Sequence, residues 1–120
     1  MNIGILGKTG EDKVANFLKK SGFKVLKRNY QSKFGEIDII AENNEYILFV
    51  EVKTRKENSL VSGVDAVNFH NQQRILLTAQ DFISKTECEL QPRFDVAEVI
   101  VNEADPENLK FSLNYTILYI

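Results

Sequence analysis

Residues 35–55 read GEIDIIAENNEYILFVEVKTR and hold two apolar runs with acidic side chains set among them. The runs cover residues 35–42 and 46–55, and the polar residues where they meet, 42–45, are typical of a turn. Alternation of apolar and polar residues indicates strands that bury one face. The segment therefore predicts a β-hairpin.

This hairpin would gather charged side chains on one face of a sheet. Since side chains alternate between the faces of a strand, Ile37 and Ile39 are expected on one face and Asp38 on the other. The register of a tight turn then places Asp38 on the same face as Glu51 and Lys53. Two carboxylates about 5 Å apart repel by roughly 3 kcal/mol at an effective dielectric constant near 20. The pattern favours a divalent-cation site, although Glu-x-Lys also occurs in half-solvated strands without one.

A cation held there would suit the cleavage of a phosphodiester. It would polarise the phosphate, orient a water molecule and offset charge on the leaving oxygen. Lys53 would stabilise the charge that develops at phosphorus or position the attacking water. Oxygen ligands favour Mg²⁺ or Mn²⁺, and the lack of a His/Cys cluster argues against zinc.

A helix is expected before the hairpin. Thr9, with Asp12 three residues later, predicts its N-terminal cap, and Gly22 predicts its end. The expected apolar stripe holds Val14, Phe17 and Leu18. Glu11 has the spacing of this inward stripe, so it is expected to point toward the sheet.

The remaining segments complete an α/β pattern. Strands are expected at 23–31 and 94–101, a long helix at 64–85, a turn at 105–108 and a final strand within 113–120. The stripe expected on the long helix is Ile75, Leu76, Ala79, Phe82 and Ile83. A helix between the third and fourth strands makes those strands parallel. The prediction is a mixed central sheet flanked by helices, and the uncharged tail would serve as a further strand or as an edge for dimerisation.

Composition indicates one domain over residues 1–120. The single cysteine, Cys88, suits a reducing compartment, so a cytoplasmic location is expected, with no secretory signal and no membrane span. Residues 1–34 carry eight basic and two acidic side chains, a net charge of +6, which leaves −8 for the rest of the chain. A basic end beside an acidic cluster fits a protein that attracts nucleic acid and holds a cation, and ordinary surface lysines would give the same asymmetry.

Several motifs together resemble the YraN family of bacterial endonuclease-like proteins, within the PD-(D/E)xK nuclease superfamily. They cover nearly the whole chain: residues 7–11 (GKTGE), 22–23 (GF), 28–30 (RNY), 35–41 (GEIDIIA), 49–55 (FVEVKTR) and 93–96 (RFDV). The resemblance implies a restriction-endonuclease-like fold with core order αβββαβ. It also implies a catalytic set of Glu11, Asp38, Glu51 and Lys53.

The same resemblance implies how these residues would act. Asp38 and Glu51 would be metal ligands, with the Val52 carbonyl as a third. Glu11 would act on the metal directly or through water, and Lys53 would be the catalytic amine. The metal would be Mg²⁺ or Mn²⁺.

Candidate nucleic-acid contacts are mostly basic and come from several segments: Lys8, Lys27, Arg28, Lys33, Arg55 and Gln72. The chain departs from the family at two places that often carry a basic residue. Asn71 or Gln72 stands early in the second helix, and Gln31 follows Asn-Tyr. The expected function is a Mg²⁺-dependent nuclease acting on DNA, with branched or damaged DNA as candidate substrates. The alternatives are a non-catalytic nucleic-acid-binding module and an assembly protein that pairs through its C-terminal strand.

Overall fold

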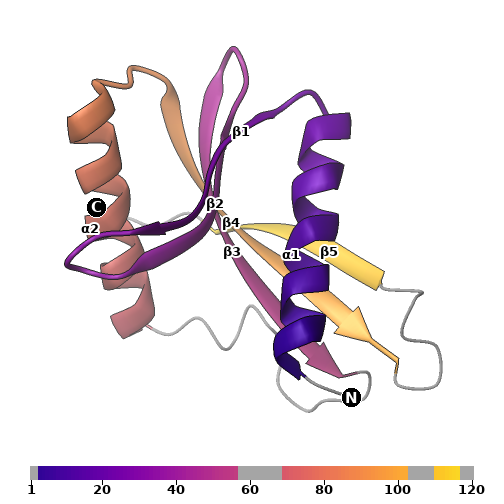
Figure 1. Ribbon diagram of the computed structural model, residues 1–120. Helices are drawn as coiled ribbons and strands as arrows, with labels where there is room; N and C mark the ends of the chain where they lie inside the picture. Colours follow the sequence, from indigo (N-terminus) through magenta and orange to yellow (C-terminus); the bar gives the residue numbers. More distant parts are fainter. Residues whose placement is uncertain (1–2, 57–68, 103–109, 117–120) are drawn as a thin grey trace.

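The computed structural model describes residues 3–56, 69–102 and 110–116, which form two helices and a five-stranded sheet. In chain order the elements are α1 (Ile3–Lys20), β1 (Lys24–Gln31), β2 (Glu36–Glu42), β3 (Tyr46–Lys56), α2 (Phe69–Thr86), β4 (Gln91–Val101) and β5 (Lys110–Thr116). The strand order is β1-β2-β3-β4-β5, with β3 and β4 parallel and the other neighbours antiparallel. α1 and α2 lie on opposite faces of the sheet (Figure 1). The predicted mixed α/β architecture is confirmed.

The first four strands lie where the sequence predicts them, and the tail supplies a fifth, β5. Three predicted pieces fall outside the described residues: the start of the second helix at 64–68, the turn at 105–108 and the last residues of the tail, 117–120. Among the described residues, no helix has the length and apolar character needed to cross a membrane.

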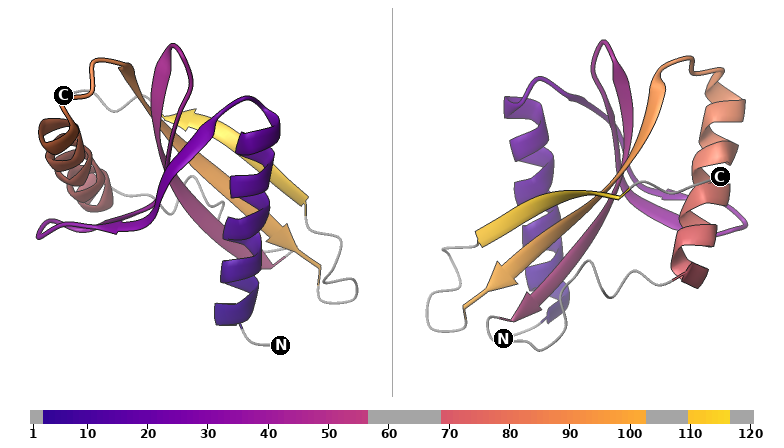
Figure 2. Two further views of the ribbon diagram at one scale, coloured as in Figure 1. Left: turned by 45° about the horizontal axis from the view of Figure 1, so that its top comes forward. Right: turned by 180° about the vertical axis from the view of Figure 1, so that it is seen from behind.

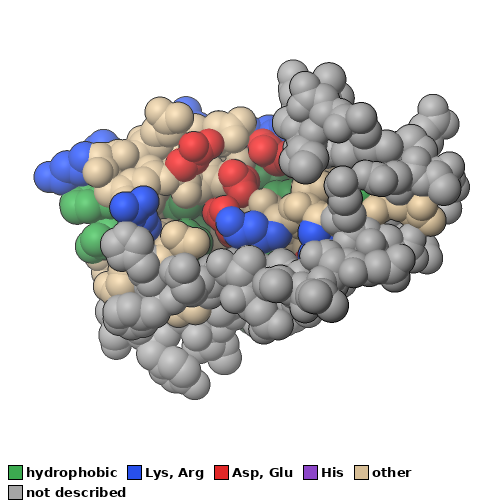
Figure 3. Space-filling model, turned by 90° about the horizontal axis from the view of Figure 1, so that it is seen from below, with side chains coloured by type: hydrophobic (Ala, Val, Ile, Leu, Met, Phe, Trp, Pro, Cys, Tyr) green, Lys and Arg blue, Asp and Glu red, His purple; other side chains and the backbone are tan. Residues whose placement is uncertain are grey.

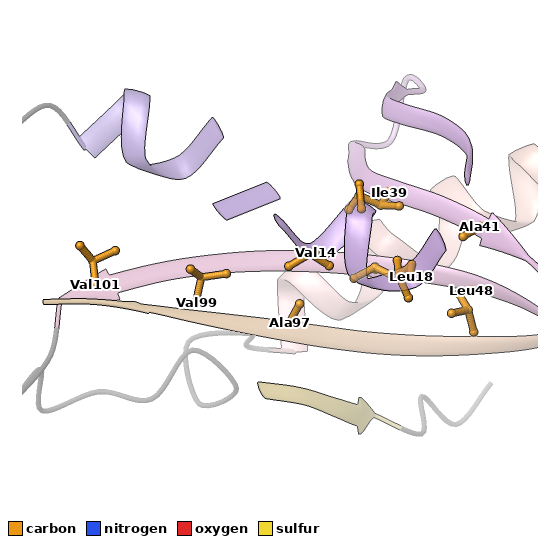
Figure 4. Close-up of a cluster of buried hydrophobic side chains, with 10 residues drawn as sticks. Val14, Leu18, Ile39, Ala41, Leu48, Ala97, Val99 and Val101 are labelled. Carbon is orange, nitrogen blue, oxygen red and sulfur yellow. The ribbon is translucent and has the colours of Figure 1, made fainter. Parts of the chain in front are cut away.

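α1 covers one face of the sheet with small and branched side chains. Val14, Ala15 and Leu18 project from the helix, and each is at most 2% exposed. They pack on β2, β3 and β4 (Figure 4), against Ile39, Ala41, Leu48, Val50, Ala97, Val99 and Val101. Full burial of one large apolar side chain contributes roughly 1.5–3 kcal/mol. This cluster therefore fixes α1, and Glu11 with it, over the middle of the sheet.

Two predictions for this helix are wrong. α1 begins at Ile3, so Thr9 lies inside the helix, and Asp12, the other half of the expected capping pair, binds Arg28 instead. Phe17 is 40% exposed although its spacing suggested the apolar stripe. Position 17 lies about 60° outside the arc that holds the three buried positions, because each residue turns the helix by about 100°.

α2 covers the opposite face with larger side chains. Of its predicted stripe, the residues that pack in this layer are Ile75, Ala79, Phe82 and Ile83. The ring of Phe49, from β3, meets Phe82 edge-on at 6.2 Å between centroids and stacks on Phe94 at 5.4 Å. Such aromatic pairs contribute about 0.5–1.5 kcal/mol beyond the area they bury. The cluster holds α2 against the hairpin predicted from residues 35–55.

The C-terminal end of α1 is closed by Gly22, as predicted. The N–H of Gly22 donates to the Lys19 carbonyl at 3.2 Å, and the N–H of Phe23 donates to the Leu18 carbonyl at 2.9 Å. Gly22 has a φ of 93°, a conformation in which a Cβ is strained. The glycine thus allows the chain to reverse from α1 into β1.

Gly22→Ala should therefore lower the free energy of unfolding by about 1 kcal/mol. No described atom lies within 4 Å of the added Cβ, so the loss would come from backbone strain and not from a clash. Urea denaturation measures it, with the exposed Lys20→Ala as the control. Equal midpoints for Gly22→Ala and the parent protein would contradict this account.

Candidate functional site

β2 and β3 part at the point where the predicted acidic residues stand. Their paired residues end at Ile39 and Val50. Beyond this pair, Asp38 Oδ2 accepts a hydrogen bond of 2.7 Å from the N–H of Val52. A side chain thus occupies a position that a backbone carbonyl holds in a regular ladder. The β1–β2 hairpin then curves away from β3 toward α2 (Figure 2).

The predicted side of the sheet is wrong for Ile37, because β2 separates from β3 next to this residue. The sequence predicts Ile37 and Ile39 on the same side of the sheet. Ile39 packs beneath α1, whereas Ile37, which is 1% exposed, packs with Ile40 in the layer covered by α2. Strict alternation requires a regular pleat, and β2 loses that regularity where its pairing with β3 ends.

Glu51 and Lys53 line a cavity of about 180 Å³ beside α2. Lys53 Nζ lies 3.3 Å from Glu51 Oε1. The cavity is lined by Gly35, Glu36, Glu51, Lys53, Asn71, Arg74 and Ile75. Asp38 is close enough for its charge to act on Glu51. The structure thus brings Asp38, Glu51 and Lys53 into one neighbourhood.

Burial makes the carboxyl groups of Asp38 and Glu51 hard to ionise. Both lie at the fork, the point where β2 and β3 separate beyond the Ile39–Val50 pair. Burial is the main cause that raises the pKa of Asp38, and the hydrogen bond from Val52 opposes the rise. Burial, followed by the negative charge of Asp38, raises the pKa of Glu51 to about 7, while Lys53 opposes it. A pair of this kind favours an added proton or an added cation near neutral pH.

Glu11 approaches the pair from α1 but is bound by an arginine. Its Oε1 accepts hydrogen bonds of 3.1 and 3.0 Å from Nε and Nη2 of Arg28, and the same Nη2 donates to Asp12 at 2.6 Å. The charge of Glu11 still raises the pKa of Asp38. Within the described ranges, no three acidic, histidine or cysteine side chains are grouped so that they could hold an ion together. Direct ligation by Glu11 would require Arg28 to release it.

The predicted nucleic-acid contacts lie on several elements. Lys27 is exposed on β1, and Lys33 is exposed in the turn between β1 and β2, with its Nζ 5.2 Å from the centre of the Phe34 ring. Gln72 is half-buried on α2, and the side chain of Lys8 lies outside the described part of the chain. The lysines of the β1–β2 hairpin therefore offer the most accessible positive charge of this set.

Two of the predicted contacts are already engaged by carboxylates. Arg28 binds the acidic residues of α1 and lines a second cavity of about 470 Å³. Arg55 Nε binds Oε1 of Glu98, a β4 residue that is 6% exposed. Each arginine would have to share or exchange a protein partner to bind a phosphate.

Two charged residues that line the first cavity are absent from the predicted set. Glu36 begins β2, and its charge raises the pKa of both Asp38 and Glu51. Arg74 lines the cavity from α2. A helical pattern could have suggested it, because Arg74 lies three residues after Asn71 and on the same face.

Seen from below, acidic side chains gather on the surface with Lys and Arg side chains beside them (Figure 3).

The fold and the site define a mixed α/β protein with a buried acidic pair and a lysine where a central hairpin opens. Residues 10–99 match the family model described as "Uncharacterised protein family UPF0102". The chain therefore belongs to the UPF0102 family, the YraN-like family that its motifs indicated.

Relatives in three bacteria match most of the chain. A UPF0102 protein of Caldanaerobacter subterraneus subsp. tengcongensis is 43% identical over 110 residues, which cover 91% of this chain and 88% of the relative. One from Fusobacterium nucleatum is 44% identical over 106 residues, 88% and 89% of the two chains. One from Persephonella marina is 37% identical over 112 residues, 92% and 97% of the two chains.

Proposed function

We propose that this protein is a Mg²⁺- or Mn²⁺-dependent nuclease that hydrolyses phosphodiester bonds in DNA, with a restriction-endonuclease-like fold of the PD-(D/E)xK type. The observation that carries the proposal is the acidic pair at the fork of β2 and β3. Asp38 and Glu51 are both buried enough to resist ionisation, and Lys53 lies beside Glu51. The order α1, three strands, α2 and a parallel strand agrees with such a fold.

The residues at the fork fit a divalent cation. Two carboxylates whose pKa values are raised by burial gain stability when a cation neutralises them. Asp38, Glu51 and the Val52 carbonyl would hold it through oxygen atoms, the ligands that Mg²⁺ and Mn²⁺ prefer. Glu11 would contribute through water while Arg28 binds its carboxylate. When bound, the ion would polarise the phosphodiester and offset charge on the leaving oxygen.

Lys53 has a separate role in this proposal. Its Nζ lies 3.3 Å from Glu51 Oε1, so the ammonium group is held at the wall of the cavity. From there it would orient the attacking water or stabilise negative charge as it develops on the phosphate. The ion pair with Glu51 restricts the lysine side chain, which keeps the charge in place before substrate binds.

The direct test is a cleavage assay. The purified protein should cut at least one of a four-way junction, a flap or a single strand of DNA in Mg²⁺ or Mn²⁺, and EDTA should stop the reaction. RNA of the same sequence shows whether the sugar matters. No cleavage of any substrate under either metal would count against the proposed function.

A second candidate is a nucleic-acid-binding module without turnover. It is favoured by the ion pair that binds Glu11 to Arg28 and so keeps one member of the expected catalytic set engaged. Salt-sensitive DNA binding that survives Glu51→Gln, without cleavage by the parent protein, would support this candidate. An assembly role stays a further prediction, because β5 lies at an edge of the described sheet. Light scattering after deletion of residues 115–120 tests it, and an unchanged oligomeric state would argue against it.

A further inference from the structure

The β1–β2 hairpin is tied to α2 by a chain of hydrogen bonds. Tyr30 Oη donates to Asp81 Oδ2 at 2.6 Å. One helical turn earlier, Ser32 Oγ and Thr78 Oγ1 lie 3.0 Å apart, and Thr78 Oγ1 donates to the Arg74 carbonyl at 2.8 Å. Thr78 is fully buried, so its bonds are shielded from water. These contacts fix how α2 stands against the hairpin.

Gly35 sets how close the two elements approach at the cavity. A Cβ at Gly35 would lie 3.3 Å from Arg74 Cβ and 3.6 Å from Thr78 Oγ1. A larger residue would therefore press on α2 at this point. The absence of a side chain lets Arg74 stand directly over the end of the hairpin, in the wall of the cavity that contains Glu51 and Lys53.

The guanidinium of Arg74 differs from those of the other three arginines. Carboxylates bind Arg28, Arg55 and Arg93. Among the described residues, no carboxylate lies within ion-pair distance of Arg74, which is exposed. A guanidinium presents five N–H donors in a planar fork that matches the oxygens of a phosphate. Arg74 thus keeps its donors available at a cavity whose other wall holds the proposed reaction centre.

We propose that Arg74 binds a backbone phosphate of the nucleic acid next to the phosphodiester that Glu51 and Lys53 face. This inference rests on the proposed function for its substrate class and adds the residue that would position the strand. Contacts to phosphate oxygens carry no base information. The site would therefore grip the strand through its backbone and bind different sequences with similar affinity.

Equilibrium binding in EDTA tests the inference without any cleavage. The probes are a fluorescein-labelled single strand and a duplex of DNA, each in two unrelated sequences, titrated at several salt concentrations. Arg74→Gln should weaken binding about tenfold for every sequence, as loss of a charged hydrogen bond does. It should also lower the slope of log affinity against log salt by about 0.7–0.9, the contribution of one phosphate contact. Arg74→Lys should retain part of the affinity and the full slope.

Lys19→Gln is the matched control, because it removes an equal charge from an exposed site on α1. If Arg74→Gln binds no more weakly than Lys19→Gln, the assignment of Arg74 is overturned, even where the parent protein cleaves DNA. If the parent protein cleaves nothing but Arg74→Gln still loses affinity and slope, the assignment stands and the nuclease proposal fails. A parent protein that binds neither probe overturns the assignment. Equal thermal midpoints for the two variants show that the change in binding is not caused by unfolding.

Discussion

Asp38→Ala should abolish metal-dependent DNA cleavage and reduce Mn²⁺ affinity by more than 100-fold. Loss of a group that merely supports a metal ligand costs about 10–100-fold in affinity, and loss of a ligand should cost more. Loss of Asp38 should have a large effect because this residue also orders the backbone where β2 and β3 separate. Its Oδ2 accepts a hydrogen bond of 2.7 Å from the N–H of Val52. The substitution would remove one carboxylate and leave the Val52 carbonyl, the proposed third ligand, less well positioned. Isothermal titration with Mn²⁺ and the cleavage assay measure the two effects.

The matched control for Asp38→Ala is Asp12→Asn. Asp12 is also acidic and contacts Arg28, but it lies on the side of α1 that faces the second cavity. It should retain Mn²⁺ binding and cleavage within about threefold, as expected for a surface charge. Equal Mn²⁺ affinity in the parent protein and in Asp38→Ala, with both folded, would rule out a cation at the fork.

The second large effect is a loss of stability with rising pH in metal-free protein. The pKa of Glu51 is about 7 in the folded protein, against an ordinary value of 4.5. Between these values the folded protein binds more protons than the unfolded chain, so the free energy of unfolding should fall as pH rises from about 4.5 to 7. The stabilising proton is fully present below this window and lost above it. The decrease attributable to Glu51 is roughly 3 kcal/mol over the whole window, at about 1.4 kcal/mol for each pKa unit.

Glu51→Gln should remove most of that decrease. The glutamine keeps a similar shape and carries no charge at any pH, so the variant should be more stable than the parent protein at pH 8. Asp38 and Asp95 also have raised pKa values and should leave a smaller slope in both proteins. Urea denaturation across pH 4.5 to 8 in EDTA measures the difference, with the exposed Glu45→Gln as the control. Parallel profiles for Glu51→Gln and the parent protein would contradict the assignment.

Mn²⁺ gives an independent check of the same effect. At pH 8 the ion should raise the thermal midpoint of the parent protein, because it binds the folded state and offsets the repulsion between the carboxylates. It should raise that of Glu51→Gln much less. An equal rise in both proteins would place the ion elsewhere.

Much of the fold follows from periodicity along the chain. The alternation in residues 35–55 predicts both strands and their pairing, which the contact of Ile39 with Val50 confirms. Four of the five residues in the predicted helical stripe, Ile75, Ala79, Phe82 and Ile83, lie on the face that α2 buries, while Leu76 is half-buried outside that cluster. These patterns succeed because one face of each element is buried against a regular neighbour.

The predictions that are wrong or incomplete concern residues whose positions depend on contacts with distant parts of the sequence. Ile37 leaves its predicted face because β2 loses its pairing with β3 beside it. The predicted cap at Thr9 is wrong because α1 already begins at Ile3, and Asp12 binds Arg28, a residue from β1. Helical spacing puts Arg74 on the same face of α2 as Asn71, but it does not show how near that face comes to the hairpin, which depends on the close approach of Gly35. Each of these contacts joins segments that are distant in the sequence.

One wall of the first cavity is formed by β2 and β3, which are neighbours in the sequence, and the other is formed by α2, which comes later in the chain. Glu36 and Glu51, which line the cavity, belong to one hairpin closed by a short turn at Asn43, whose side chain accepts the N–H groups of Glu45 and Tyr46. Arg74 arrives only after the chain has crossed over to α2. Nearby contacts form faster than distant ones during folding. The acidic residues of the hairpin can therefore come together early in folding. Arg74 reaches them only when α2 packs against the sheet.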